Sequence, residues 1–223
     1  MKIILLVSCI IFSLSSFSQE NKKYNIGDFA QGGIIFWLDE SGEHGLVCAK
    51  EDYSELVPWD TQLRTGAEGT RTVAPENAIV LSLGDGPYSG ELNTAIIVAA
   101  LGYGDGRVYA AAACNELQIT ENGITYGDWF LPSREELNIM YKNRKLIDKV
   151  ALGNGGKVFH QKGDYKVIGN HYWSSTEDYR RDKNIIVSPS HSAWIHNFKK
   201  GGQSFQIPAR KYMTNSVRAI RAF

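Results

Sequence analysis

The hydrophobic pattern near the start of the chain predicts a pair of β-strands. Apolar, β-branched and aromatic residues run from Gly32 to Leu38, and a second apolar run covers Leu46 to Ala49. Residues 41–45 between them (Ser-Gly-Glu-His-Gly) have the composition of a turn. Two such runs joined by a short, glycine-containing turn are typical of a β-hairpin.

The middle of the chain changes to a helical pattern. Residues 93–101 and 108–117 are rich in alanine and are compatible with helices. A further helix is predicted to begin at about Arg134, because Ser133 is a good N-cap and Glu136 completes a capping box three residues later. This helix ends near Tyr141 or continues toward Leu152.

The last third of the chain alternates short apolar runs with polar stretches, which is typical of strands joined by loops. A strand pair, two or three helices and a late group of strands together predict an α+β fold. The candidate strands cover residues 172–176, 193–198, 202–207 and 216–223.

The first eighteen residues have the features of a secretory signal peptide. Lys2 supplies a positive charge, residues 3–17 are apolar, and residues 16–18 (Ser-Phe-Ser) form a cleavage site. Cleavage before Gln19 would leave residues 19–223 as a single domain. The alternative is lipidation at Cys9, which follows Leu-Val-Ser.

No later apolar run reaches the roughly 20 residues that a membrane-spanning helix needs. We therefore expect no transmembrane segment after signal cleavage, and a secreted, periplasmic or cell-surface location. Because the chain is exported, nucleic acid is not an expected partner.

Charge is distributed unevenly although the chain as a whole is neutral. Residues 19–132 carry a net charge of −11, and residues 133–223 carry +10. Either the second half presents a basic binding face, or the two halves interleave in space and neutralise each other.

The mature chain keeps two cysteines, Cys48 and Cys114, each within an apolar run. In an oxidising compartment they could form a disulfide. The alternative is a pair of small buried thiols.

Catalytic and cofactor motifs are missing from the sequence. There is no Gly-x-Ser-x-Gly element, and the five histidines lack the spacing of a metal site. Asp85-Gly86 and Asp105-Gly106 do not form the spaced acidic array of an EF-hand, so calcium is not indicated by a motif. We expect no enzyme activity, no catalytic residue, no metal ligand and no cofactor.

Several segments resemble, in the same order, the signature of a known protein family. They are Gly32-Gly33-Ile34-Ile35-Phe36, Ala112-Ala113-Cys114-Asn115, Gly127-Asp128-Trp129-Phe130-Leu131-Pro132-Ser133 with Glu136-Leu137, Tyr172-Trp173-Ser174-Ser175-Thr176-Glu177, Ala193-Trp194 and Val217-Arg218-Ala219-Ile220-Arg221. The chain is thus similar to the Lcl C-terminal domain family, which takes its name from a collagen-like bacterial adhesin. The resemblance covers nearly all of the mature chain.

This resemblance implies a C-type lectin-like fold with paired terminal strands, flanking helices and a long loop region. The family's adhesin binds sulfated polysaccharide, so the resemblance implies extracellular binding. The helix start and the terminal arginine-rich strand are also similar to the formylglycine-generating enzyme group. That activity needs paired cysteines late in the chain, and none follows Cys114.

The residue pattern itself suggests where binding would occur. Basic and aromatic side chains recur in the loops of the last third, and such groups can pair with sulfates or carboxylates and stack on sugar rings. The expected partner is an extracellular glycan or sulfated polysaccharide, or else a surface protein. The alternative for these residues is ordinary solubilising charge. The candidates are Tyr179, Arg180 and Arg181, then Lys199 and Lys200 on a predicted hairpin turn, and finally Arg210 and Lys211.

Overall fold

The computed structural model describes residues 22–60, 63–65, 71–73, 80–102, 108–159, 171–178, 192–198 and 205–223, with backbone alone for 63–65 and 71–73. This part of the chain has an α+β fold in which the paired strands run antiparallel and three helices pack beside them. The predicted fold class is confirmed at this level. The signal peptide, with Cys9, lies outside the described residues.

The first sheet joins strands from both ends of the described chain. Its order is β1-β2-β3-β13, where the strands are β1 (Phe29–Ala30), β2 (Gly33–Leu38), β3 (Gly45–Cys48) and β13 (Ile220–Ala222). The predicted hairpin is confirmed as β2 and β3, with Ile34 opposite Cys48. On its other side β3 pairs with β13, so the last strand closes against the first hairpin.

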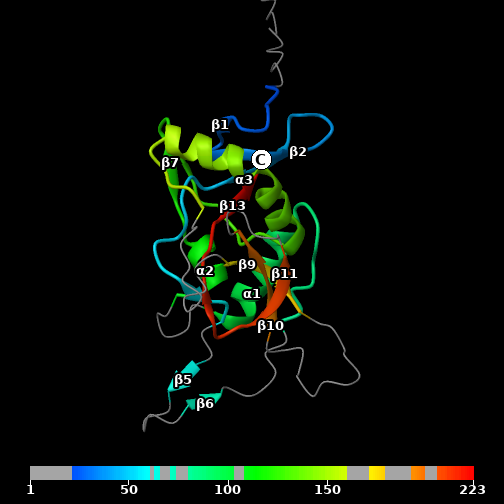
Figure 1. Ribbon diagram of the computed structural model, residues 1–223, viewed down its shortest axis with the longest axis vertical. Coiled ribbons are helices and arrows are strands. Elements are labelled where there is room, and N and C mark those ends of the chain that lie inside the picture. Colours follow the sequence, from blue (N-terminus) through cyan, green and yellow to red (C-terminus); the bar gives the residue numbers. More distant parts are fainter. Residues whose placement is uncertain are drawn as a thin grey trace, which may run out of the picture.

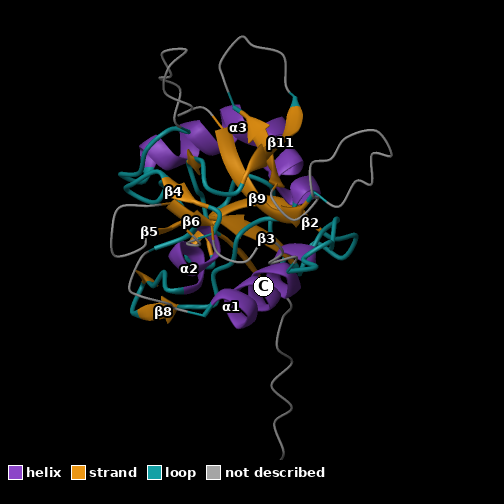
Figure 2. Ribbon diagram, turned by 90° about the horizontal axis from the view of Figure 1, so that it is seen from below, coloured by secondary structure: helices purple, strands orange, loops and turns teal. Residues whose placement is uncertain are grey.

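Both faces of this sheet are buried, which explains why its strands consist of consecutive apolar residues. Ile34 and Phe36 face a core cluster that includes Leu137 and Met140 of the long helix α3 (Arg134–Gly153). Ile35 faces the opposite way, into a cluster that includes three tryptophans and four residues of the short, alanine-rich helix at residues 110–115. We call these the α3 core and the tryptophan core. Figure 2 shows α3 on one side of β2 and β3, and the helices α1 (Ser89–Leu101) and α2 (Ala110–Asn115) on the other.

The second sheet has the order β11-β10-β9. Its strands are β9 (His171–Glu177), β10 (Ser192–Asn197) and β11 (Gln206–Arg210). The first two were predicted closely, whereas β11 lies several residues later than the expected 202–207. Figure 1 places this sheet below the first one, beside α1 and α2.

Three short strand pairs complete the described β-structure. They are β4 (Val57–Pro58) with β12 (Thr214–Asn215), β5 (Leu63–Thr65) with β6 (Arg71–Val73), and β7 (Ile119–Glu121) with β8 (Ile124–Tyr126). The last pair turns at Asn122 and Gly123, both with positive φ. An Asn-Gly turn between strands is a strong hairpin signal, and the sequence prediction missed it.

The helices are α1 (Ser89–Leu101), α2 (Ala110–Asn115) and α3 (Arg134–Gly153). The predicted start of α3 is confirmed, and the helix takes the longer of its two expected lengths. Its capping box is complete, since the Ser133 hydroxyl accepts from the Glu136 N–H at 3.2 Å and the Glu136 carboxylate accepts from the Ser133 N–H at 2.6 Å. Two orphan N–H groups at the start of α3 are satisfied in this way.

The side chains of strand β9 form hydrogen bonds with several segments that are distant in sequence. Trp173 is buried and donates its indole N–H to the Val57 carbonyl at 2.9 Å. The Ser174 hydroxyl donates to the Trp194 carbonyl, and the Thr176 hydroxyl both donates to the Gly84 carbonyl and accepts from the Arg134 N–H. The side chains of this segment therefore have structural roles, since they bond to backbone groups of segments that are distant in sequence.

Ion pairs link the acidic first half to the basic second half. Four described pairs join a cation after residue 132 to a carboxylate before it, as expected if the halves interleave and neutralise each other. They are Arg134–Asp85, Lys157–Glu51, Arg218–Asp52 and Arg221–Asp128.

Cys48 and Cys114 do not form the disulfide that was considered. Cys48 lies in the α3 core and Cys114 in the tryptophan core, on opposite faces of the first sheet. Burial raises the pKa of both thiols, that of Cys48 to about 12. Both residues therefore act as small buried side chains.

Candidate binding site

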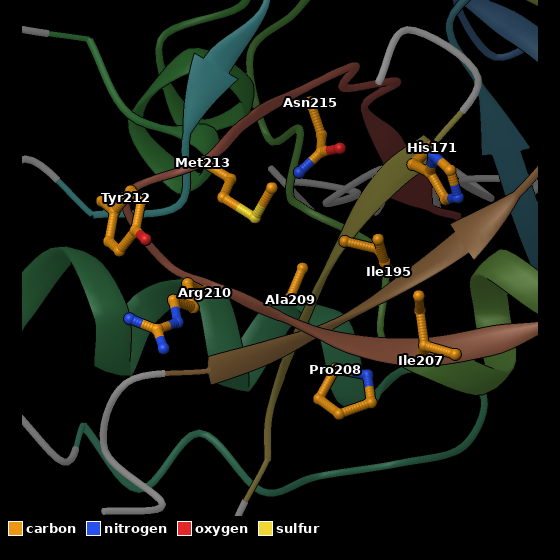
Figure 3. Close-up of a pocket in the computed structure, with 9 residues that line it drawn as sticks. All are labelled: His171, Ile195, Ile207, Pro208, Ala209, Arg210, Tyr212, Met213 and Asn215. Atoms are coloured by element: carbon orange, nitrogen blue, oxygen red, sulfur yellow. The ribbon is translucent and has the colours of Figure 1, made fainter. Parts of the chain in front are cut away.

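A cavity of about 490 Å³ opens where the second sheet meets the segment that follows β11 (Figure 3). Its walls are mainly apolar, with a few polar side chains among them. The residues that line it are His171, Ile195, Ile207, Pro208, Ala209, Arg210, Tyr212, Met213 and Asn215. A concave, largely apolar pocket with a few polar groups is the usual form of a small-molecule site.

The strand register brings these residues together from separate parts of the chain. Ile195 of β10 lies opposite Ile207 of β11 and also beside Trp173 of β9. After β11 the chain turns back, so that Asn215 of β12 pairs with Val57 of β4. The next N–H, of Ser216, donates to the His171 carbonyl at 3.0 Å. Backbone hydrogen bonds therefore hold Asn215 and Ser216 between β4 on one side and the start of β9 on the other.

The polar groups of the cavity differ in their exposure. Arg210 is exposed, and its guanidinium carbon lies 6.0 Å from the centroid of the Tyr212 ring, which is 48% exposed. Figure 3 shows this pair at one end of the cavity and His171 at the other. Asn215 between them is completely buried.

The predicted binding residues fall into three groups. Tyr179, Arg180, Arg181, Lys199 and Lys200 lie outside the described residues, as does the predicted hairpin turn that holds the two lysines. Arg210 is exposed at the cavity, as predicted for a surface cation. Lys211 is the exception, and its placement corrects the prediction of an exposed side chain.

Lys211 points inward, where it forms a buried ion pair with Glu177. Its side chain is 4% exposed and that of Glu177 is 1% exposed, and its ammonium lies 4.3 Å from the centroid of the Trp59 ring. Glu177 also accepts from the N–H groups of Val80 and Leu81, at 3.2 and 2.8 Å. The negative charge of Glu177 draws Lys211 away from the surface.

The sequence prediction did not identify Asn215, Met213 or Ile195 as cavity residues. Asn215 stands in an ordinary polar stretch, Thr-Asn-Ser, and no motif distinguishes it. The apolar residues were interpreted only as strand positions. The cavity exists because three distant segments meet, and hydrophobic periodicity carries no information about such a meeting.

Glu136 and His196 are two of the buried titratable groups that lie outside the cavity. Burial raises the pKa of Glu136 to about 7, although its carboxylate accepts from the Ser133 and Gly90 N–H groups. Gly90 has to be glycine there, because a Cβ at this position would lie 2.3 Å from a Glu136 oxygen. Burial lowers the pKa of His196 to about 4, and its ring stacks on Tyr141 with 4.6 Å between centroids.

These two shifts have opposite effects on the pH dependence of stability. The raised pKa of Glu136 makes the fold lose stability as pH rises from 4.5 through about 7. The lowered pKa of His196 makes it gain stability as pH rises from about 4 through 6.5. Each contribution is on the order of 3 kcal/mol, so between pH 4.5 and 6.5 the two should nearly cancel.

We therefore expect that removing either group by substitution makes the free energy of unfolding depend visibly on pH. Glu136→Gln should make the free energy of unfolding rise by about 2 kcal/mol from pH 4.5 to 6.5, because only the His196 contribution remains. His196→Gln should make it fall by a similar amount. Urea denaturation of both variants and the wild type across this range measures the slopes. A Glu136→Gln curve parallel to that of the wild type would contradict the raised pKa of Glu136.

The residues that the structure describes show neither a metal-binding cluster nor a membrane-spanning helix. Among them no group of three or more His, Cys, Asp or Glu side chains is placed to hold a metal ion. None of the described helices has the length and apolar character needed to cross a bilayer.

Comparison with known proteins gives no match: no family model fits the chain, and no curated protein is significantly similar to it. Function is therefore inferred from the cavity and from the resemblance described above.

Proposed function

We propose that this chain is an exported binding protein without catalytic activity, and that it recognises a glycan, most suitably an anionic polysaccharide. The observation that carries the proposal is the apolar cavity with Arg210 and Tyr212 at one end. In this proposal the domain has a C-type lectin-like fold like that of the Lcl C-terminal domain family, and it acts in the periplasm, at the cell surface or outside the cell.

The arrangement of strands supports the lectin-like fold. The strand nearest the C-terminus pairs with the first hairpin through β13 and β3. Helices pack on both faces of that sheet. The segments that carry the family resemblance lie at structural positions, such as the start of α3 and strand β9.

The chemistry of the cavity supports a sugar with a negative group. The guanidinium of Arg210 can form two parallel hydrogen bonds with a sulfate or carboxylate. The exposed Tyr212 ring offers an apolar face on which a sugar ring can stack. The titratable residues that line the cavity are His171, Arg210 and Tyr212, a set suited to holding an anion.

A glycan array that includes sulfated and carboxylated chains tests the proposal at physiological salt. We expect the wild type to bind anionic glycans and Arg210→Glu to bind them at least tenfold more weakly, because the substitution replaces attraction by repulsion. Lys145→Glu is the matched control, since it makes the same charge change on the exposed face of α3, outside the cavity. An equal loss in both variants would indicate a general charge effect and contradict a site at Arg210.

A protein-interaction module is the second candidate. Large apolar side chains are exposed around the start of α1, namely Leu81 (56%), Leu83 (41%), Tyr88 (39%) and Leu92 (65%). Exposed apolar groups close together favour a protein interface. If no glycan on the array were bound, the glycan proposal would fail and this candidate would take its place.

A further inference from the structure

Residues 80–88, which lead into α1, have a polar side chain inside and apolar side chains outside. Ser82 is completely buried, whereas Leu81 and Leu83 on either side of it are 56% and 41% exposed. Leu83 donates its N–H to the Leu81 carbonyl at 2.9 Å, which closes a three-residue turn at Ser82. Leucines are ordinarily the buried residues and serines the exposed ones, so this arrangement is the reverse of the usual one.

Polar contacts with three other elements hold this segment in place. Its start is bonded to the Glu177 carboxylate of β9, as described above. The Asn93 side chain of α1 accepts from the Gly84 N–H at 3.0 Å and donates to the Gly84 carbonyl at 2.8 Å. Asp85 forms an ion pair with Arg134 at the start of α3. The exposure of the leucines therefore follows from a backbone that is fixed at several points.

Two features of the segment cost stability. Leu81 and Tyr88 have φ angles of 62° and 67°, in the left-handed region that residues other than glycine rarely adopt. The buried Ser82 hydroxyl has no hydrogen-bond partner among the described residues. Backbone strain of this kind is concentrated at functional sites, where the surrounding structure maintains it. The exposed leucines are thus typical of a recognition surface rather than of an ordinary connecting loop.

The outward face of α1 continues this apolar surface. Leu92 is 65% exposed, and Ala95 and Ala99, three and seven residues later, are exposed on the same face. After Thr94 the helix has no polar side chain. A surface helix normally has a polar outward face, and a helix that is apolar on all sides is expected to be covered. Alanines beside a leucine leave room for the side chains of a second helix.

Acidic side chains lie around these apolar groups. Glu91 is exposed and adjoins Leu92, and Asp85 belongs to the segment itself. The pKa of the Tyr88 hydroxyl is raised by burial and by the charge of Asp39, which places Asp39 close to Tyr88. Among the described residues, Asp39 and Glu91 form no ion pair. A second copy of the same surface, an anionic membrane or an anionic glycan would be repelled here, whereas a cationic partner would be attracted.

We propose that the surface formed by Leu81, Leu83 and Leu92, which we call the leucine surface, binds a basic amphipathic helix of a partner protein. Apolar residues of that helix pack on the three leucines and on the alanines of α1. Its lysines or arginines pair with Glu91 and Asp39. This inference names a partner for the exposed leucines and does not depend on the glycan site.

Two model peptides test the chemistry of the partner. The first is a labelled helical peptide of leucine and lysine, with leucines at positions i, i+3, i+4 and i+7, and the second has glutamate in place of lysine. Fluorescence anisotropy measures their binding to the full chain at about 0.15 M salt. We expect the lysine peptide to bind at least tenfold more tightly than the glutamate peptide, and its affinity to fall as the salt concentration rises.

Matched variants test whether the peptide binds at the leucine surface. Leu92→Gln and Glu91→Lys should each weaken binding of the lysine peptide at least fivefold, since one removes an apolar contact and the other reverses a charge. Leu152→Gln and Glu51→Lys are the controls. Leu152 is 61% exposed in the last turn of α3, and Glu51 is 46% exposed near the same end of that helix. The leucine surface lies at the opposite end of α3, where Asp85 is bound.

The outcomes separate the proposed partner from the other possible occupants. Equal binding of the two peptides, or equal losses in Leu92→Gln and Leu152→Gln, would overturn the proposal. Sedimentation velocity detects self-association, and a dimer that Leu92→Gln abolishes would mean that a second copy covers the surface instead. All four substitutions are at exposed positions, so the melting temperature should change by only a few degrees. The result is independent of the glycan array, because Leu92 and Glu91 do not line the cavity.

Discussion

Replacing Lys211 by methionine is expected to lower the free energy of unfolding by about 3–5 kcal/mol. Methionine keeps most of the apolar stem but removes the ammonium, so Glu177 would remain buried without its counter-ion. The carboxylate would keep its two backbone donors at Val80 and Leu81, which compensate only part of its charge. The contact of the ammonium with the Trp59 ring would be lost as well.

Two variants test whether the buried charge is the cause. Glu177→Gln combined with Lys211→Met removes both charges, and the double variant should recover much of the lost stability in urea denaturation. Arg210→Met is the matched control, because Arg210 is adjacent in sequence but exposed, and its substitution should change stability by less than about 0.5 kcal/mol. A loss for Lys211→Met as small as that of the control would show that the pair contributes little.

The contrast between Arg210 and Lys211 shows where sequence interpretation reaches its limit. Both residues belong to a basic run with Tyr212, and the sequence alone gives them the same character. The direction of each side chain depends on where β11 ends and on Glu177, which lies 34 residues earlier. A long-range partner of this kind leaves no local pattern around residue 211.

Several features that depend on local order were predicted, although the β7–β8 hairpin was missed. The capping box at Ser133 and Glu136 and the hairpin of β2 and β3 both follow from neighbouring residues or from strand periodicity. The pairing of Arg218 with Asp52 and of Arg221 with Asp128 agrees with the alternative that the two halves interleave and neutralise each other. In that case the charge imbalance between the halves was the informative signal.

The site was less accessible to prediction than the fold. Of the predicted residues within the described chain, Arg210 lines the cavity and Lys211 does not. Asn215 is unusual only because its amide is buried without a partner, which is a property of the packed structure. The same limit applies to Cys48 and Cys114. Their apolar surroundings predicted that both are buried, but not that they lie on opposite faces of a sheet.

Arg218 is the second position at which a large loss of stability is expected, about 3 kcal/mol for Arg218→Met. Its guanidinium is completely buried, donates to Asp52 at 2.6 Å and to the Lys157 carbonyl at 3.2 Å, and lies 4.0 Å from the centroid of the Phe159 ring. Burial lowers the pKa of this guanidinium, but the charge and hydrogen bond of Asp52, together with the nearby Tyr172 and Cys48, outweigh burial and raise the pKa.

Arg221 provides a comparison on the same terminal segment, because its partner Asp128 is 60% exposed. Exposed ion pairs contribute at most about 1 kcal/mol, so Arg221→Met should cost at least 2 kcal/mol less than Arg218→Met in urea denaturation. Asp52 also accepts a hydrogen bond from the Tyr172 hydroxyl at 2.6 Å. Because Arg218 and Tyr172 share this carboxylate, Tyr172→Phe should change the free energy of unfolding by a different amount in the Arg218→Met variant than in the wild type. Equal losses of stability in Arg218→Met and Arg221→Met would mean that burial does not strengthen the ion pair of Arg218. In that case the contact of β13 with β3, rather than the Asp52 network, would hold the end of the chain in place.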